Sequence, residues 1–214
     1  MRELLWSPDT RVTRPVSAVA LYLHGGTVHS HRSVRRTATT LHRARWLRDA
    51  IAPSLAQAGI ASALLRYTVR GWNAKHGEPA PLADARWALE QVAERHDVPI
   101  ILVGHSMGAR TGLHVADHPN VIGLVAVAPW FPADEPVDTL SRRHLSVLHG
   151  SKDRITSPSE SRILAERSEA VTISTHFIPM DGLGHYLLAR AADWHRTTRA
   201  EIFRMAEAGH EATL

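Results

Sequence analysis

The most constraining feature of the sequence is a Gly-His-Ser-Met-Gly segment, residues 104–108, that lies between two apolar stretches. Residues 98–103 before it have the length and β-branched content of a strand buried on both faces. Residues 109–116 after it place apolar side chains at helical spacing. A Gly-x-Ser-x-Gly motif on a strand-to-helix turn is typical of a nucleophile elbow, a tight and strained turn that projects the serine hydroxyl. The pattern predicts that Ser106 is a nucleophile and that the two flanking glycines are steric requirements.

Apolar stretches of strand length alternate along the chain with stretches of helical periodicity. Strands are predicted at residues 16–23, 60–65, 98–103, 121–128, 145–148 and 171–178. Helices are predicted at residues 41–58, 81–92 and 109–116, after Pro158 and at the C-terminus. This alternation indicates an α/β fold with a mostly parallel central sheet, helices on both faces and a single domain over residues 1–214. Ligands of such sheets bind beyond the carboxyl ends of the strands.

Some finer expectations come from the same pattern. Residues 3–15 should form a peripheral hairpin that turns at residues 7–9. Ile163 and Leu164 should both point inward from the helix after Pro158. Leu188 should lie on the apolar side of the C-terminal helix.

Composition limits the chemistry and the partners. The 214 residues include no cysteine, which excludes disulfides, thiolate metal sites and a cysteine nucleophile. No apolar stretch approaches the roughly 18 residues that cross a bilayer, and the N-terminus lacks the apolar core of a secretory signal. The net charge is +4, and the arginine excess is local. We therefore expect a cytoplasmic protein that binds neither a membrane nor nucleic acid.

A serine hydroxyl needs a general base, and the base needs a group that orients it. His185 is the predicted base, because it follows the last predicted strand in a glycine-rich loop that can return over the sheet edge. Other histidines fit this role less well. His24 and His149 lie beside glycines at strand ends, where we expect them to brace loops. His105 lies inside the motif and cannot fold back onto Ser106.

Asp153 is the predicted orienting acid. It ends the segment His-Gly-Ser-Lys-Asp, residues 149–153, which follows a predicted strand. A buried carboxylate there would hold the imidazole tautomer and stabilise the imidazolium. Asp134 and Asp138, after the preceding strand, are the alternative acids, and a helix-capping role near Pro158 is the alternative for Asp153. The order Ser, Asp, His along the chain is the one expected with this type of elbow.

Two backbone amides are expected to stabilise the oxyanion that forms when a carbonyl is attacked. The first is the amide of Met107, at the start of the helix after the elbow. The second should come from the loop after residues 16–23, where glycines let the backbone approach an anion. We assign it to Gly26, with Thr27 as the near alternative.

Three residues are predicted to contact the substrate, namely Gly25, Thr27 and Trp130. Trp130 and the adjacent Phe131 follow a predicted strand end and could form one wall of a pocket. The segment 66–72 could form another wall.

Arginines are concentrated in residues 28–48, directly after the glycine-rich loop. They are Arg32, Arg35, Arg36, Arg43, Arg45 and Arg48. We favour a solvated loop and an exposed helix face for them. If the segment overhangs the site instead, a positive rim would favour esters that carry a carboxylate or a phosphate.

Together these motifs resemble the α/β-hydrolase-fold serine hydrolases. The resemblance runs from Val16 to the C-terminal helix and is carried by four segments, residues 24–26, 104–108, 149–153 and 184–185. It implies hydrolysis of a small-molecule ester or related acyl compound through an acyl-enzyme, with no metal or organic cofactor. The chain is similar to the lidless, dienelactone-hydrolase-like members, although those have cysteine at the position of Ser106. Where many relatives insert a helical cap, this chain has only residues 129–143.

The motifs leave other functions open. A thioesterase, amidase, acyltransferase or lyase would use the same residues, because these enzymes differ in their pockets and in the access of water. A non-catalytic binding protein with the same fold and a nucleic-acid-binding module are alternatives of other classes. The oligomeric state is not encoded in these motifs.

Overall fold

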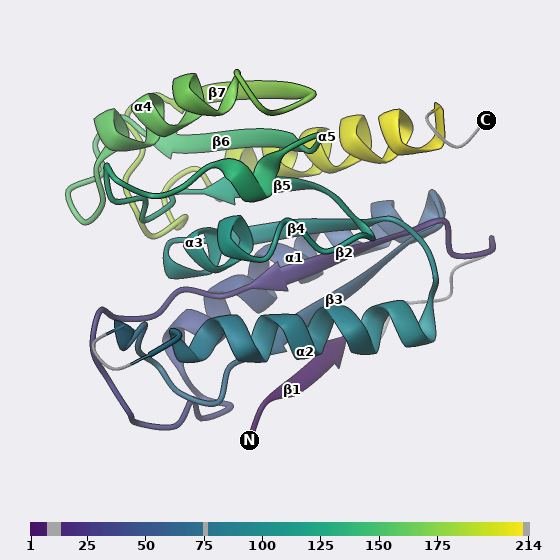
Figure 1. The fold of residues 1–214 in the computed structure, drawn as a ribbon, viewed down its shortest axis with the longest axis horizontal. Helices are drawn as coiled ribbons and strands as arrows, with labels where there is room; N and C mark the ends of the chain where they lie inside the picture. Colours follow the sequence, from purple (N-terminus) through teal and green to yellow (C-terminus); the bar gives the residue numbers. More distant parts are fainter. Residues whose placement is uncertain (8–13, 75–76, 212–214) are drawn as a thin grey trace.

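The computed structural model describes residues 1–7, 14–74 and 77–211. Within these residues a seven-stranded sheet has the order β1-β3-β2-β4-β5-β6-β7 (Figure 1). The strands are β1 (Glu3–Trp6), β2 (Ala18–Leu23), β3 (Ile60–Arg66), β4 (Ile100–His105), β5 (Val121–Val127), β6 (His144–Gly150) and β7 (Ser174–Met180). β1 is antiparallel to β3, and all the other neighbouring strands are parallel. The mostly parallel sheet predicted from the sequence is confirmed.

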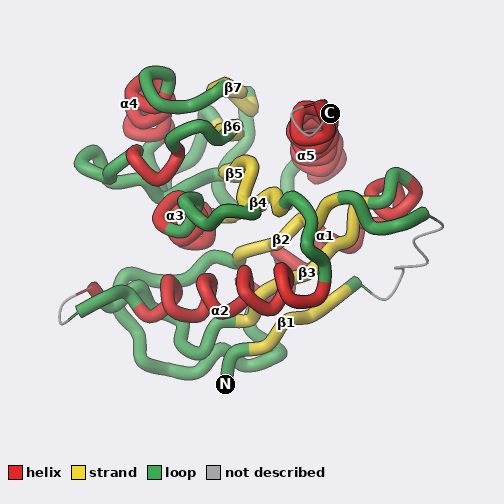
Figure 2. Tube along the Cα trace, turned by 45° about the vertical axis from the view of Figure 1, so that its right-hand side comes forward, coloured by secondary structure: helices red, strands yellow, loops and turns green. Residues whose placement is uncertain are grey.

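Helices cover both faces of this sheet, as predicted. They are α1 (Thr39–Gln57), α2 (Ala80–Arg95), α3 (Met107–His114), α4 (Pro158–Ser168) and α5 (Ala191–Glu211). Figure 2 shows α1 and α5 on one face and α2, α3 and α4 on the other. Among the described helices, none is both long and apolar enough to span a membrane.

The inner strands are apolar along their whole length because helices cover them on both sides. Every residue of β2 and of β4 is buried, as a sheet without a solvent face requires. α2 shows the complementary pattern on a helix. Its inner face consists of Leu82, Ala85, Leu89 and Val92, each at most 4% exposed.

The strand register brings the predicted motifs to one edge of the sheet. Leu23, the last residue of β2, lies opposite Gly104 of β4, and Gly104 lies opposite Ala126 of β5. Leu148 near the end of β6 lies opposite Val127. The loops that follow these strands therefore leave the sheet side by side, at its carboxyl edge (Figure 1).

The N-terminal strand lies at the edge of the sheet. β1 pairs with β3, and residues 8–13, which would form most of the turn and second arm of the predicted hairpin, lie outside the described residues. Arg48 of α1 is only 1% exposed and donates to the carbonyl of Leu5 at 2.5 Å. Glu3 of β1 pairs with Arg66 of β3. These long-range bonds hold β1 on the outer edge of β3.

Two side chains also point differently from the prediction. Leu164 of α4 is buried, but Ile163 is 47% exposed, because successive helical residues are rotated by about 100° and only one of the two can face the sheet. Leu188 is 66% exposed and precedes α5, whose buried side carries Trp194, Ile202 and Met205.

The minimal cap expected between β5 and β6 is confirmed. Residues 129–143 contain one short 3₁₀ turn, Asp138–Leu140. Leu140 is fully buried, and the Thr139 hydroxyl donates to the carbonyl of Leu113 at 2.6 Å. The segment therefore packs back against α3.

Candidate active site

The turn between β4 and α3 has the geometry of the predicted elbow. Ser106 has φ 56° and ψ −118°, a backbone conformation that costs a non-glycine residue on the order of 1–3 kcal/mol. A Cβ on Gly104 would lie less than 3.0 Å from the backbone of Ala109, and one on Gly108 would lie as close to the carbonyl of Leu23. Real Cβ atoms essentially never approach so closely, so the predicted steric requirement for both glycines is confirmed.

Ser106, His185 and Asp153 form one hydrogen-bonded chain, although they come from three different loops. Ser106 Oγ lies 3.1 Å from His185 Nε2, and His185 Nδ1 lies 2.8 Å from Asp153 Oδ2. The three residues are 8%, 6% and 9% exposed. In this arrangement His185 donates its Nδ1–H to the carboxylate, and its Nε2 accepts from the serine hydroxyl. The structure thus brings together the three side chains that the sequence pointed to.

The carboxylate of Asp153 is held by several donors. Oδ1 accepts from the amides of Ile155 and Thr156 at 2.8 and 3.0 Å. Oδ2 accepts from His185, from the Thr156 hydroxyl at 3.0 Å and from His149 Nε2 at 3.2 Å. Burial alone would raise the pKa of Asp153, but the hydrogen bonds from the two histidines and the two amides outweigh it and hold that pKa well below its usual range. The group is therefore an ionised carboxylate at neutral pH.

The alternatives considered for the acid lie elsewhere. Asp134 and Asp138 are both exposed. Ser157 is the N-cap of α4, and its side chain accepts from the amide of Glu160 at 3.2 Å. Asp153 therefore does not cap that helix.

His149 makes a contact that sequence reasoning missed. Its ring is buried between Asp153 and Ser161, with Nδ1 2.9 Å from the Ser161 hydroxyl. Since Nδ1 accepts from that hydroxyl, Nε2 carries the proton that is donated to Asp153. The four-residue spacing of His149 and Asp153 within one segment was the available signal, but it does not show which way the loop turns.

His105 is buried beside the candidate base. Its Nε2 lies 3.0 Å from the carbonyl oxygen of His185, and the two ring centroids are 5.0 Å apart. Nδ1 of His105 finds no hydrogen-bond partner within the described residues. Burial, together with the nearby His185, lowers the pKa of His105 to about 3. The ring is therefore neutral and adds no positive charge next to His185.

The loop after β2 lies directly against the elbow. A Cβ on Gly25 would lie 3.3 Å from Ser106 Cβ, and one on Gly26 would meet both the Met107 side chain and the carbonyl of Arg70 at less than 3.0 Å. The amide of Thr27 already donates to that Arg70 carbonyl at 3.0 Å. Of the two candidates for the second oxyanion donor, Gly26 is thus the one whose amide is not occupied by this bond.

His24 orients the peptide between Gly25 and Gly26. Its Nε2 accepts from the amide of Tyr67 at 3.3 Å, so its Nδ1 carries the proton and donates to the carbonyl of Gly25 at 2.7 Å. In a trans peptide the N–H points opposite to the C=O, so the amide of Gly26 points away from the His24 ring. The predicted bracing role of His24 fits these bonds. Burial lowers the pKa of His24 to about 4, so the ring is neutral.

Trp130 lies beside Ser106 and next to Trp72 and Arg110. The amide of Trp130 donates to the carbonyl of Ser106 at 3.2 Å. The guanidinium of Arg110 lies between the rings of Trp72 and Trp130, at 4.3 and 4.4 Å from their centroids. Glu135 is buried and pairs with Arg110.

A shallow hollow of about 470 Å³ extends beside Trp130. Its lining includes Asp153, Ile155, Thr156 and Pro158. The adjacent Phe131 is 1% exposed and belongs to the hydrophobic core, so its suggested role as a pocket wall is wrong.

The described residues contain no cluster of side chains that could hold a metal ion. The groups that the structure does bring together are a serine hydroxyl, an imidazole, a buried carboxylate and backbone amides.

Comparisons with known proteins agree with this fold. In the solved structures, a serine hydrolase without a lid from Xanthomonas campestris has a TM-score of 0.68 and 18% identity over 95% of this chain and 88% of its own. A putative alpha/beta hydrolase from Agrobacterium tumefaciens has a TM-score of 0.70 and 17% identity over 97% and 92%. Est1E from Butyrivibrio proteoclasticus, solved with ferulic acid bound, has a TM-score of 0.65 and 13% identity over 95% of each chain.

At these identities the likeness shows the fold alone. No curated protein matches the chain. The profile of the Alpha/beta hydrolase family matches residues 20–209, a stretch that contains the elbow and both of its hydrogen-bonded partners. The chain therefore belongs to the alpha/beta hydrolase family.

Proposed function

We propose that this protein is a serine hydrolase that cleaves a small carboxylic ester through an acyl-enzyme intermediate. The observation that carries the proposal is the continuous hydrogen-bonded chain from Ser106 through His185 to the ionised Asp153. It lies next to the amide of Met107, at the start of α3. Membership of a hydrolase family, with esterases among the similar structures, supports the same chemistry.

In the first half of the reaction, His185 Nε2 takes the hydroxyl proton while Ser106 Oγ attacks the ester carbonyl. The oxyanion that forms is stabilised by the amides of Met107 and Gly26. Asp153 stabilises the imidazolium without taking its proton. When the tetrahedral intermediate collapses, His185 protonates the leaving alcohol and the acyl group stays on Ser106.

In the second half, water repeats the sequence. His185 takes a proton from a water molecule as the water attacks the acyl-enzyme, and it returns that proton to Ser106 Oγ when the carboxylic acid leaves. Neutral His105 is suited to this place, because a second positive charge close to His185 would oppose formation of the imidazolium in both halves.

Two structural features keep the nucleophile in position. His149 donates to Asp153 Oδ2, the same carboxylate oxygen that accepts from His185. The carbonyl of Ser106 accepts from the amides of Ala109 and Trp130, which fixes the strained turn from two directions. Gly25, Thr27 and Trp130 remain the residues that we propose to border the substrate.

The test is covalent labelling with a fluorophosphonate together with hydrolysis of p-nitrophenyl acetate. Ser106→Ala should remove the label and lower turnover by about 10⁴-fold or more. Ser141→Ala is the matched control, since Ser141 is exposed and far from the elbow in sequence, and it should keep both activities. If the wild type takes up no label and cleaves no ester, a non-catalytic binding protein is the better assignment.

A further inference from the structure

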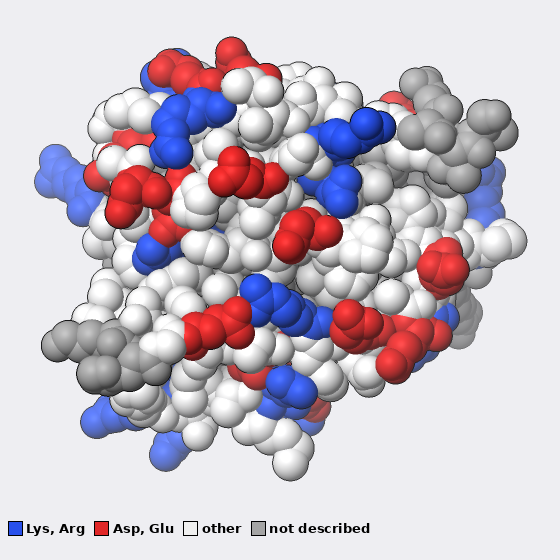
Figure 3. Space-filling model, in the orientation of Figure 1, with Lys and Arg blue, Asp and Glu red and all other residues white. Residues whose placement is uncertain are grey.

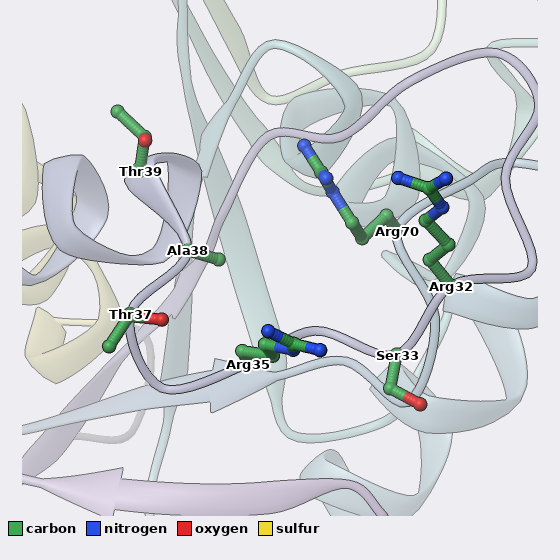
Figure 4. Close-up of a pocket in the computed structure, with 7 residues that line it drawn as sticks. All are labelled: Arg32, Ser33, Arg35, Thr37, Ala38, Thr39 and Arg70. Atoms are coloured by element: carbon green, nitrogen blue, oxygen red, sulfur yellow. The ribbon is translucent and has the colours of Figure 1, made fainter.

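A second hollow, of about 620 Å³, opens next to the loop that carries Gly26. Three arginines line it, together with the first residues of α1. Figure 4 shows the side chains of Arg32 and Arg70 extending in similar directions from two neighbouring loop segments. Arg35 and Thr39 lie at other positions around the hollow. Arg32 and Arg35 come from the β2–α1 loop, and Arg70 comes from the β3–α2 loop.

The backbone forces these arginines together. The amide of Arg70 donates to the carbonyl of Arg32 at 3.0 Å. Ser33 and Val69 form an antiparallel bridge beside that bond. The two loops are therefore bonded to each other where Arg32 and Arg70 lie, which holds the bases of these two exposed side chains close together.

No carboxylate balances these charges. Among the described residues, Arg32, Arg35 and Arg70 make no ion pair, whereas Arg36 and Arg48 of the same segment pair with Glu3 and Asp49. Other arginines in the described ranges of the chain also lack an ion pair, so what distinguishes these three is that they line one hollow. On the face that carries α2, α3 and α4, basic and acidic side chains are intermixed (Figure 3).

The first turn of α1 adds further donors to the hollow. Ala38 is the N-cap and makes no side-chain capping bond, and the first turn contains no acidic residue. The amides of a first helical turn lack partners within the helix and carry the positive end of its dipole. Ala38 and Thr39 line the hollow, so these amides add to the attraction that three guanidinium groups exert on an anion.

The hollow shares its backbone with the candidate active site. The carbonyl of Arg70 accepts from the amide of Thr27, and it is one of the atoms that a Cβ on Gly26 would meet. The two loops leave the same carboxyl edge of the sheet as the elbow (Figure 1). The backbone of Arg70, one of the lining residues, is therefore in contact with the loop that carries the Gly26 amide.

We infer that this hollow binds the carboxylate or phosphate group of an acidic ester substrate. The inference rests on the proposed function, since the ester must reach Ser106. It also revises the interpretation of the arginine-rich segment. Arg32 and Arg35 act with Arg70, which lies outside that segment. Arg43 instead stacks on the ring of Tyr186 at 4.7 Å.

The test compares mono-p-nitrophenyl glutarate with p-nitrophenyl pentanoate, an acidic and a neutral ester with five-carbon acyl chains. The wild type should show a KM at least about tenfold lower for the acidic ester, and raising the salt from 20 to 500 mM should reduce this preference. Arg70→Gln and Arg35→Gln should each raise KM for the acidic ester by about tenfold and leave kcat unchanged. The KM for the neutral ester should stay the same in both variants. The control is Arg45→Gln, which changes an exposed arginine on α1 and should leave KM unchanged for both esters.

A second measurement separates the possible failures. Inorganic phosphate should bind the wild type, as titrated by calorimetry, and binding should be lost in Arg70→Gln. Phosphate binding with equal KM values for the two esters would assign the hollow to a separate anionic ligand and overturn the assignment to the substrate. If phosphate does not bind and the two KM values are equal, the anion site itself is overturned. Ser106-dependent cleavage of the neutral ester would still leave the proposed function intact.

Discussion

Acidification from pH 8 to pH 5 should destabilise this protein, because two buried histidines must stay neutral in the fold. The pKa of His24 is lowered to about 4 by burial, and that of His105 to about 3 by burial and by His185. Donation to the carbonyl of Gly25 raises the pKa, but burial outweighs it, and a second hydrogen bond also favours the neutral ring of His24. Its Nε2 faces the amide of Tyr67, so a proton there would replace a hydrogen bond with two opposed N–H groups.

The size of the effect comes from linkage. In the unfolded chain a histidine has a pKa of about 6.5, so the unfolded state binds more protons than the folded state between that pH and the folded pKa. Stability is therefore intact above pH 6.5 and is lost as the pH falls through this window. About 1.5 pH units of the window lie above pH 5, and each unit corresponds to about 1.4 kcal/mol. Each histidine should remove about 2 kcal/mol from the free energy of unfolding.

Urea unfolding followed by tryptophan fluorescence at pH 8, 7, 6 and 5 measures this loss. Stopping at pH 5 avoids the carboxylates with lowered pKa, among them Asp153 and Glu135, which add their own loss at lower pH. His24→Asn should reduce the loss by about 2 kcal/mol, and His29→Asn, at an exposed position, should not change it. A direct check by NMR needs no variant. If His24 takes up its proton above pH 5.5 in the folded wild type, the reasoning is wrong.

Three further results are expected. Asp153→Asn should lower kcat by about 10⁴-fold, because the histidine tautomer is no longer held. Asp138→Asn, at an exposed position, should change kcat little. The reverse result would assign the acid to the β5–β6 segment. His149→Ala should remove a hydrogen bond to a charged group and lower the free energy of unfolding by about 2 kcal/mol, with a smaller loss of kcat than Asp153→Asn; unchanged urea unfolding would contradict the bond. Gly26→Ala should lower both the esterase rate and phosphonate labelling, because the Cβ of the new alanine would meet Met107 and Arg70. Circular dichroism should show an intact fold. Full activity would place the second oxyanion donor elsewhere.

Much of the fold could be predicted because local patterns and global topology agree. Apolar stretches without polar interruption predict strands buried on both faces, and β2 and β4 show this burial. Parallel strands end at one edge, which is why His185 and Asp153 could be placed near Ser106 although they are 79 and 47 residues away in sequence. The glycines of the elbow are determined by contacts within a few residues and with one neighbouring strand.

What the sequence could not show depends on long-range pairing. The pairing of β1 with β3 brings Glu3 to Arg36 and Arg66, and this decides which arginines of the basic segment are neutralised. Glu3 and Arg66 are far apart in the sequence, and no local pattern indicates that they meet. His149 is a similar case. Its contact with Asp153 depends on how the β6–α4 loop turns, and no spacing rule determines that turn.

The segment between β5 and β6 shows how a chain without a cap can still support the strained backbone of Ser106. The amide of Trp130 bonds the carbonyl of Ser106, and the buried Glu135 pairs with Arg110 and His114 of α3. Arg110 is in turn held between Trp72 and Trp130. Each bond ties the segment to the helix that begins at the elbow, so the residues after β5 stabilise the turn instead of covering it. With no inserted cap in residues 129–143, we expect selectivity to come from the loops around the elbow. Two of these loops bring arginines without an ion pair among the described residues, Arg32 and Arg35 from the β2–α1 loop and Arg154 from the β6–α4 loop.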